Sequence, residues 1–401
     1  MGFWLTGEVS DGEFRLTEKD LHQWDLITQF RSKLTELIKA EERHPSFEDP
    51  ARKLALLDYL SLFLFGLFNP AVKTMRALCS ASQLERVKKE ICGREVSLGS
   101  FSEAQHLVDT AYLERVFGEL FSQQRALVPA DKRLGLHEWV ARDSSVFAAL
   151  PRMAWALYGG GRAGAPNRAV RLHLNVDLFS DSPQLCQITE GKVCERKSWE
   201  EQLKPWTGYV GDRNFGRSYR LFEKLGEKNC SFVLRLLDET TINLEEELPV
   251  SEADRQEGVV RQAWATLGKA EYRSVRVRVV WVEGKDCALI LVTNLSPQAL
   301  SADLVSMLYR RRWQIECFFR WIKCVLGCRH WFAESQQGVT IQLYLALIAS
   351  LLLQAVIGRR PNKRMLELLQ LYQMGWASLE ELINGINREQ QRESKRKKRR
   401  V

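Results

Sequence analysis

The sequence predicts an α/β protein whose core is a mixed sheet. Its 401 residues, of which 45% are apolar, suffice for a large buried core in two or three domains and exclude a chain that is disordered throughout. At residues 170–178 apolar and polar side chains alternate, which is typical of a strand with one buried face. The chain then switches between strand and helix patterns, and this order indicates a mixed sheet.

The overall charge is only weak support for a nucleic-acid partner. It is +8, from 58 Lys and Arg against 50 Asp and Glu. Six positive charges lie in Lys395–Arg400, a run that we expect to be disordered, so the rest of the chain is nearly neutral. Nine cysteines without a CxxC pair, and no secretory pattern at the start, predict reduced thiols in a cytoplasmic protein.

Residues 1–135 carry short helical patterns. An apolar segment at Leu54–Phe68 ends at an Asn-Pro pair, and a second helical pattern spans Gln83–Ile91. Ser102–Gln105 matches a capping box, so we expect a further helix to begin there. Several short helices with tight breaks fit a small DNA-binding bundle, and they fit a plain packing domain equally well.

From about residue 136 the pattern changes to strands. Asp177 falls opposite the apolar face of the strand at 170–178 and is expected to be exposed, and Asp181 follows in a turn. A helix is expected at Arg217–Glu227, between two of the strands. The other expected strands are Trp139–Phe147, Gln184–Ile188, Gly208–Gly211 and Ser231–Leu236.

Residues 237–292 look like a separate β piece. Alternate valines from Val275 to Val279 are interleaved with Arg276 and Arg278, so we expect these arginines to face solvent or a polyanion. An ordinary solvated strand face would show the same alternation.

Three helices are expected after the strands. The first is Ser301–Gly327. The second, Val339–Ile357, is a stretch of 19 mostly apolar residues, and its polar interruptions favour a buried core helix over a membrane span. The third, Met365–Ile386, has a weaker helical periodicity.

The helix at Ser301–Gly327 carries the most informative pattern. At about 100° per residue, with Tyr309 set to zero, Arg312 falls at about −60°. Glu316 then falls at about −20° and Lys323 at about −40°. These four groups share a narrow polar stripe opposite an apolar face. A carboxylate between cations is a stabilised anion that can bind a metal ion, although an ion-paired surface helix would give the same stripe.

The spacing Tyr309-x2-Arg312-x3-Glu316-x6-Lys323 resembles the YREK signature of bacterial insertion-sequence transposases of the DDE type, the insertion-sequence-four family. Four residues at three fixed intervals make this signature much more specific than a single glycine motif. By its spacing, Glu316 corresponds to the family's catalytic glutamate.

Two further segments carry the same resemblance. Val140–Ser145, which contains Asp143, is similar to the family's first-Asp strand, and Gly208–Phe215, which contains Asp212, is similar to its second-Asp motif. The resemblance covers nearly the whole chain and is strongest from about 137 to 357. It implies an RNase H-like catalytic core with a β-rich insertion domain and helical regions at both ends. The implied parts are a helical N-terminal DNA-binding region at 1–135, a catalytic core at 136–236 and 293–358, an insertion at 237–292, and a helical C-terminal segment with a basic tail at 359–401.

By this resemblance Asp143, Asp212 and Glu316 are the catalytic and metal-binding carboxylates. Cutting a DNA phosphodiester uses two divalent ions about 4 Å apart, one at the attacking and one at the leaving oxygen. Mg²⁺, for which Mn²⁺ substitutes, takes one or two carboxylates per ion. Asp177 and Asp181 are the rival acids, and Asp143 is preferred because Asp177 is expected to be exposed and Asp181 lies past its strand.

The resemblance also implies DNA-binding residues. The tyrosine, arginine and lysine of the signature would hold phosphates at the DNA end through charge-assisted and directional hydrogen bonds. Arg320, at about 20° on the same stripe, is a further candidate. In this family the insertion domain can supply an aromatic ring that stacks on a flipped base, for which Trp264 and Trp281 are candidates. Either tryptophan could instead be a core residue.

The implied function is DNA transposition by a cytoplasmic, nucleoid-associated enzyme with no membrane partner. The protein would bind the element's terminal inverted repeats, as a homodimer on two synapsed ends. It would cut with a metal-activated water and join the freed 3′-hydroxyl to double-stranded target DNA, with the basic tail as a salt-sensitive tether. Two alternatives stay open. One is a DNA-binding relative or inhibitor that no longer catalyses, and the other is an RNase H-like nuclease that does not transpose.

Overall fold

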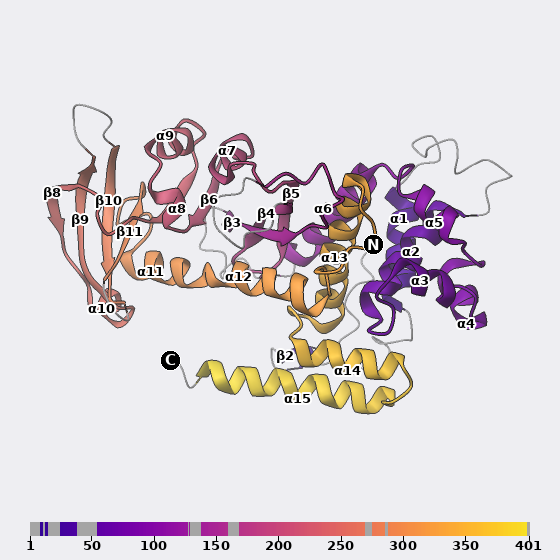
Figure 1. Cartoon of the computed structure of the whole chain (residues 1–401). Helices are drawn as coiled ribbons and strands as arrows, with labels where there is room; N and C mark the ends of the chain where they lie inside the picture. The colour runs from indigo at the N-terminus through magenta and orange to yellow at the C-terminus, as the bar shows by residue number, and fades with distance from the viewer. Residues whose placement is uncertain are drawn as a thin grey trace. The chain divides into compact units, whose positions relative to one another are not determined.

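The protein is a mixed α/β chain that divides into two compact units (Figure 1). The sheet unit comprises Val128–Phe147 and Leu157–Phe319, and the helical unit comprises Met1–Leu127, Ala148–Ala156 and Arg320–Val401. These units group residues by contact and do not follow the domain boundaries expected from the sequence, which stay a prediction. The computed structural model describes residues 9–10, 13–14, 25–37, 54–126, 128, 138–158, 168–268, 275–284 and 288–398.

Nine strands of the described residues form one sheet, in the order β5-β4-β3-β6-β7-β11-β10-β9-β8. β3 pairs in parallel with β6, and β6 with β7, whereas the strands beyond β7 pair antiparallel. The predicted mixed sheet is therefore confirmed, and the predicted core strands are all present. The strands are β3 Glu138–Ala148, β4 Ala169–Asp177, β5 Pro183–Glu190, β6 Thr207–Gly211, β7 Ser231–Arg235, β8 Ile242–Leu248, β9 Val259–Leu267, β10 Val275–Val282 and β11 Leu289–Thr293.

Both faces of β4 are buried, so the prediction of one buried face is wrong. β4 lies between β3 and β5, and polar side chains of its second face pair inside the protein. Asn175 accepts a hydrogen bond from the buried guanidinium of Arg142 at 3.0 Å. Asp177, which was expected to be exposed, is only 2% exposed, because its Oδ1 accepts from the N–H and the hydroxyl of Ser180.

The helices of the sheet unit connect its strands, and two of them contain residues of the polar stripe. The helix expected at Arg217–Glu227 begins at Tyr219, where the Ser218 side chain caps the first turn. The helix expected at Ser301–Gly327 is divided, because α11 and α12 meet at Arg312. The helices are α7 Glu195–Glu201, α8 Arg213–Gly216, α9 Tyr219–Glu227, α10 Glu252–Gln256, α11 Ala302–Arg311 and α12 Trp313–Arg320.

The strands of the predicted separate β piece continue the same sheet, because β11 pairs with β7. Arg276 is exposed and pairs with Glu245, as expected of a solvent-facing arginine. Arg278 is fully buried, so the prediction that it faces solvent or a polyanion is wrong. The reason is that α11 packs against β9 and β10, where Arg278 donates to Gln262 Oε1 at 3.2 Å and to the carbonyl of Leu300.

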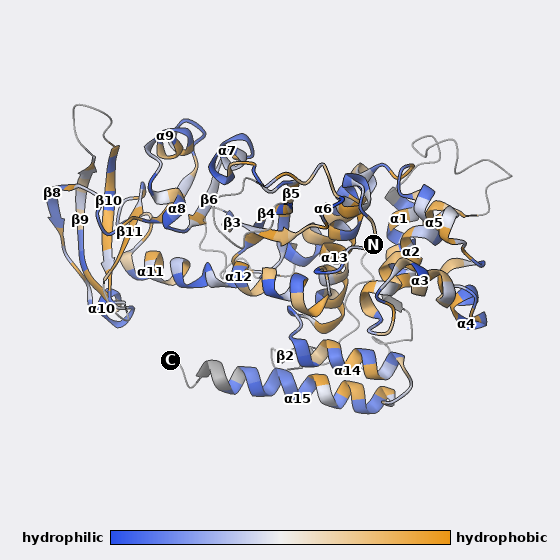
Figure 2. Cartoon of the chain, in the orientation of Figure 1, coloured by the Kyte–Doolittle hydropathy of each residue, from blue (hydrophilic) through white to orange (hydrophobic). Residues whose placement is uncertain are grey.

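The helical unit is built around α13 (Gln336–Ile357), which packs against α2 and α6. Figure 2 shows how apolar α2 and α13 are. Among the described residues α13 alone is long and apolar enough to cross a membrane, and 94% of its apolar stretch is buried inside the protein, as predicted for a core helix. The other elements are β1 Val9–Ser10, β2 Glu13–Phe14, α1 Asp25–Leu37, α2 Leu56–Phe68, α3 Met75–Ala81, α4 Glu85–Val87, the π-helical turn η4 Lys88–Cys92, α5 Leu98–Ala104, α6 Thr110–Ala126, the π-helical turn η6 Trp321–Val325, α14 Lys363–Gln373 and α15 Leu379–Lys398.

The capping-box prediction at Ser102 is wrong. Ser102 lies inside α5, whose first turn is already capped by the Ser97 hydroxyl, which accepts from the Ser100 N–H at 3.1 Å. The next helix, α6, begins at Thr110. A serine followed three residues later by glutamine therefore fell in the middle of a short helix instead of at its start.

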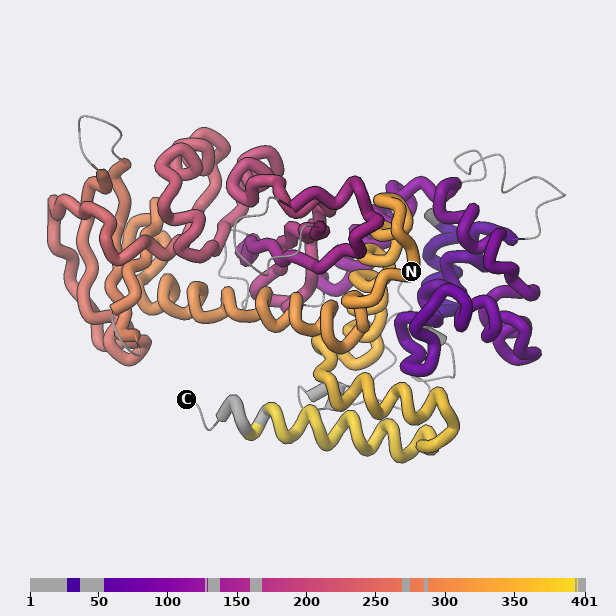
Figure 3. The backbone as a smooth tube through the Cα atoms, in the orientation of Figure 1, coloured from indigo at the N-terminus to yellow at the C-terminus, as the bar shows by residue number. Residues whose placement is uncertain are grey.

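The expected C-terminal helix is two helices in the structure. The chain turns between α14 and α15 at Gly375, whose φ of 81° lies in the left-handed region that favours glycine. Helix α15 continues to Lys398, so the expectation of a disordered basic tail is wrong for residues 395–398. Figure 3 shows the backbone turning back between α14 and α15. Residues 399–401 lie outside the described part of the chain.

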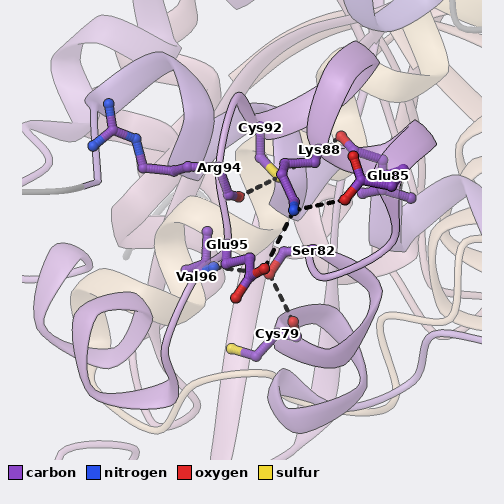
Figure 4. Close-up of polar contacts among 9 residues, drawn as sticks. Cys79, Ser82, Glu85, Lys88, Cys92, Arg94, Glu95 and Val96 are labelled. Carbon is purple, nitrogen blue, oxygen red and sulfur yellow. Dashed lines mark hydrogen bonds and ion pairs between the residues drawn. The ribbon is translucent and has the colours of Figure 1, made fainter.

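Polar contacts fix the turn around η4 in the helical unit (Figure 4). Lys88 Nζ lies 3.0 Å from a carboxylate oxygen of Glu85 and 3.2 Å from one of Glu95. The Ser82 hydroxyl accepts from the N–H of Val96 at 2.8 Å. These contacts stabilise a local turn, and the DNA-binding role of residues 1–135 stays a prediction.

Candidate active site

The two predicted aspartates lie on neighbouring parallel strands, Asp143 within β3 and Asp212 directly after β6. Ala141 of β3 is in register with Val210 of β6, and Asp143 and Asp212 each lie two residues further along. Adjacent strands lie about 4.8 Å apart, so this register brings the two carboxylates into one neighbourhood. Asp212 is also the N-cap of α8, where its Oδ1 accepts from the N–H of Asn214 at 2.9 Å.

Arg312 links the first aspartate to the glutamate. Its Nη2 lies 2.7 Å from Glu316 Oε1, and its Nη1 lies 3.7 Å from Asp143 Oδ2. The Arg312 side chain is 12% exposed, against 18% for Asp143 and 27% for Glu316. Tyr309 stands beside it, with the guanidinium carbon of Arg312 5.6 Å from the ring centre. Arg312 and Glu316 of the predicted stripe thus form an ion-paired cluster with Asp143 of β3.

A fourth carboxylate, which the sequence analysis missed, belongs to this cluster. Burial, and then the charges of Glu195 and Asp212, raise the pKa of Asp143 to about 8, against the opposing effects of the Ser144 N–H and Arg312. Glu195 is the first residue of α7, and Glu residues at helix starts are too common to mark a site by sequence alone. The burial of Arg312 would lower its pKa, but the carboxylates of Glu316 and Asp143 raise it.

Removing the Asp143 charge should stabilise the protein in the absence of metal. The folded-state pKa of about 8 lies above that of an unfolded aspartate, near 3.9, so wild-type stability falls as pH rises between these values. We expect Asp143→Asn to raise the thermal midpoint more at about pH 8 than at about pH 5. Calorimetry in EDTA measures the midpoint, with the exposed Asp238→Asn as control. Equal midpoints at the higher pH would contradict the raised pKa.

The donor set suits a hard divalent cation in its chemistry. Every candidate ligand is a carboxylate oxygen, which Mg²⁺ prefers. Among the described residues, Glu316 Oε2 and Glu195 Oε1 are buried and have no hydrogen-bond partner. No three acidic, histidine or cysteine side chains of the described residues are already grouped to hold one ion. The carboxylates thus suit a metal ion by their chemistry and by their unpartnered oxygens, whereas Arg312 is their present counter-charge.

The rival acid Asp177 has its hydrogen-bond partners outside this cluster. Asp177 is occupied by its bonds to the turn at Ser180. Asp181 has a φ of 54°, a left-handed conformation that fits the predicted turn. Arg312 forms ion pairs with Asp143 and Glu316.

Two candidate cations lie in the helical unit. Arg320 ends α12 and is exposed, and Lys323 lies in η6. Burial, and then the charge of Arg329, lower the pKa of Lys323. Since the two units are described separately, the roles of Arg320 and Lys323 at the acids stay predictions.

The two candidate tryptophans occupy opposite faces of the sheet. Trp264 pairs across with Arg278, whereas Trp281 pairs with Arg261, three residues later in β10 and three residues earlier in β9. An arginine lies over each ring, Arg276 at 4.6 Å from Trp264 and Arg261 at 4.9 Å from Trp281. Both rings are partly exposed.

Trp313 is a second residue that the sequence analysis missed. It follows Arg312 and is 56% exposed, which is unusual for so large an apolar side chain. Its helical angle, about 40° from Tyr309, puts it on the polar stripe, one turn before Glu316. The signal that could have found it is an aromatic residue on a face otherwise made of charged groups.

Comparison with known proteins shows the family to which this chain belongs. A family model described as Transposase DDE domain matches residues 137–352, more than half of the chain. The chain is 30% identical over 225 residues to a "Probable transposase for insertion sequence element IS5377" of Geobacillus stearothermophilus, covering 54% of this chain and 55% of that protein. It is 26% identical over 221 residues to a protein of Sinorhizobium fredii named as a transposase, covering 53% and 60%.

A third relative is matched over more of its length. The chain is 24% identical over 325 residues to a protein of Synechocystis sp. named as a transposase for insertion sequence element IS4SA, covering 79% of this chain and 86% of that one. The chain spans little more than half the length of the first two relatives.

Solved structures give weaker similarities. A piggyBac transposase synaptic complex with hairpin DNA is matched at 11% identity and a TM-score of 0.42, over 92% of this chain and 78% of that one. A Mos1 transposase paired-end complex with the left transposon end is matched at 14% identity and a TM-score of 0.18, over 39% and 56%. Similarities of this size do not establish a shared fold, so the RNase H-like core stays a prediction.

Proposed function

Because the chain belongs to the DDE transposases of bacterial insertion sequences, we propose that it cuts DNA at the ends of its element and joins those ends to target DNA. The observation that carries the proposal is the arginine bridge from Asp143 to Glu316, with Asp212 leaving the next parallel strand. Two strands and one helix each contribute one carboxylate to this neighbourhood, in the order that the family signature expects.

The finer assignment is to the YREK, or insertion-sequence-four, group with an RNase H-like core. Tyr309, Arg312 and Glu316 lie in succession along α11 and α12, with Arg312 at their junction. The parallel pair β3 and β6 carries the aspartates. The N-terminal helices as the DNA-binding region, and the strands beyond β7 as the insertion, are parts of the same proposal.

Asp143, Asp212 and Glu316 would hold two Mg²⁺ ions, or Mn²⁺ in their place. When bound, these ions activate the attacking oxygen and neutralise the leaving oxygen of the phosphodiester. Asp212 is pre-positioned for this role by its bond to the Asn214 N–H. Glu316 keeps a second, unbonded oxygen in the buried cluster.

Arg312 and its neighbours would bind the DNA backbone. In the DNA-free protein Arg312 is held by two carboxylates, and a scissile phosphate beside them would take over part of its hydrogen bonding. Tyr309 would add a directional bond, and Lys323 and Arg320 would add charge to adjacent phosphates. The exposed ring of Trp313 offers a stacking surface near the reacting phosphate.

The partners are double-stranded DNA of the element ends and of the target, bound by a homodimer in the synaptic complex. The basic end of α15 would act as a non-specific tether that weakens with salt. The protein would work in the cytoplasm, at the nucleoid.

The test uses DNA with the inverted repeats that flank the gene. Wild-type protein with Mg²⁺ should cut at the repeat and produce strand-transfer products in supplied target DNA. End-specific binding without cleavage would favour a silent relative or inhibitor, and cleavage without strand transfer would favour a nuclease that does not transpose.

Only one of the substitutions Trp264→Ala and Trp281→Ala should weaken the binding of end DNA. The two rings face opposite sides of the sheet, so one DNA end reaches one of them. Loss of a base stack costs about 1–3 kcal/mol, roughly 5- to 150-fold in Kd. The affinity is measured by anisotropy, and 2-aminopurine at the flanking nucleotide reports the stack. Weakening by neither variant, or equally by both, would contradict the expectation.

A further inference from the structure

We propose that Glu195 is a positioning residue of the acid cluster, a fourth carboxylate that raises its affinity for divalent cations. This inference rests on the proposed function and adds a residue that lies outside the DDE and YREK patterns. It concerns how strongly the cluster attracts a cation before DNA is bound.

Glu195 is tied to the second aspartate through one asparagine. Its Oε2 accepts from Asn214 Nδ2 at 3.0 Å, and the backbone N–H of Asn214 donates to Asp212 Oδ1 at 2.9 Å. Asn214 therefore orients both carboxylates at once. Asn214 lies two residues beyond Asp212 in α8, so its side chain and its backbone N–H connect Glu195 to a proposed metal ligand.

The second carboxylate oxygen of Glu195 has an environment that a cation would complete. Glu195 Oε1 is buried and has no hydrogen-bond partner among the described residues, and the same is true of Glu316 Oε2. A buried charged oxygen without a partner is costly, by about 1–3 kcal/mol or more. A cation close to the cluster would remove that cost for both oxygens.

The charge count also leaves room for a divalent ion. When all four are ionised, as a bound cation favours, Asp143, Glu195, Asp212 and Glu316 contribute four negative charges. Arg312 and the fully buried Arg142 contribute two positive ones. The Arg142 guanidinium donates to Asn175 and Ser198 and therefore supplies positive charge without a hydrogen bond to an acid. The remaining imbalance equals the charge of one Mg²⁺.

A purely structural role for Glu195 makes a different prediction. If Glu195 served only to accept the bond from Asn214, glutamine would replace it, because its amide oxygen accepts the same bond. If its charge matters, Glu195→Gln loses cation affinity while the fold is kept. Glu195→Asp keeps the charge on a shorter side chain and should retain part of the affinity.

The experiment titrates the DNA-free, full-length protein with Mn²⁺ and follows free Mn²⁺ by electron paramagnetic resonance. We expect Glu195→Gln to raise the Kd for Mn²⁺ about tenfold or more, the usual effect of losing a residue that supports metal ligands. Glu201→Gln, an exposed change on the same helix, is the matched control and should bind as wild type does. Thermal midpoints check that each variant is folded.

The outcomes separate this inference from the proposed function. Wild-type protein that binds no Mn²⁺ would count against both. Wild-type binding that Glu195→Gln leaves unchanged would overturn only the role of Glu195. Weaker binding by Glu195→Gln, with partial recovery in Glu195→Asp and none in the control, is the result that the inference predicts.

Discussion

Cleavage of end DNA by the Glu316→Gln variant should fall by on the order of 100- to 1,000-fold, the size of effect seen when groups aimed at developing charge are removed. Glu316 supplies the helix-borne carboxylate of the cluster, and one of its oxygens has no other partner among the described residues. Glutamine keeps the size of the side chain and can still accept from Arg312, so the loss isolates the charge. The measurement is the single-turnover rate of strand cleavage with Mg²⁺ or Mn²⁺.

The exposed Glu239→Gln variant is the control and should cut as fast as wild type. Asp143→Asn and Asp212→Asn should lose cleavage to a similar extent, because residues that act as a unit are not additive. Equal cleavage by Glu316→Gln and wild type would remove Glu316 from the site.

Replacing Arg312 by alanine should weaken the binding of end DNA about 30-fold or more, since losing one partner of a buried charge pair costs about 2 kcal/mol or more. The substitution removes a phosphate contact and leaves Asp143 and Glu316, which now share the guanidinium, to repel the DNA. Arg312→Lys should fall between, because an ammonium cannot bridge two carboxylates as a planar guanidinium does. Fluorescence anisotropy over a salt series measures both affinity and slope.

In Arg312→Ala the slope of log Kd against log salt concentration should be smaller by about one, because one phosphate contact is lost. Arg255→Ala, on exposed α10, serves as the control and should keep the wild-type slope. An unchanged affinity together with an unchanged slope would show that Arg312 does not touch DNA.

Strands and long helices were predictable because their patterns report burial directly. The alternation at 170–178 and the apolar stretch of α13 correspond to buried elements. The pattern failed where both faces of an element are covered. Asp177 and Arg278 fall on the polar side of their strands, yet each finds partners inside the protein. Alternation alone cannot tell solvent from a buried polar network.

Helical spacing and the family signature predicted only part of the candidate site. Angles along one helix placed Tyr309, Arg312 and Glu316 together, and the structure joins two of them by an ion pair. Glu195 was out of reach because its place in the cluster depends on the packing of α7, which brings it to Asn214. Trp313 was within reach, since its position on the stripe follows from spacing alone.

Asp143, Asp212 and Glu316 are proposed to form one metal site at the reacting phosphate. Anomalous scattering from Mn²⁺ in crystals of the protein with its own end DNA tests it most directly. The expected result is Mn²⁺ peaks among these three carboxylates, with the scissile phosphate beside them. Well-ordered end DNA with no peak at the three carboxylates, or with peaks only elsewhere, would contradict the claim.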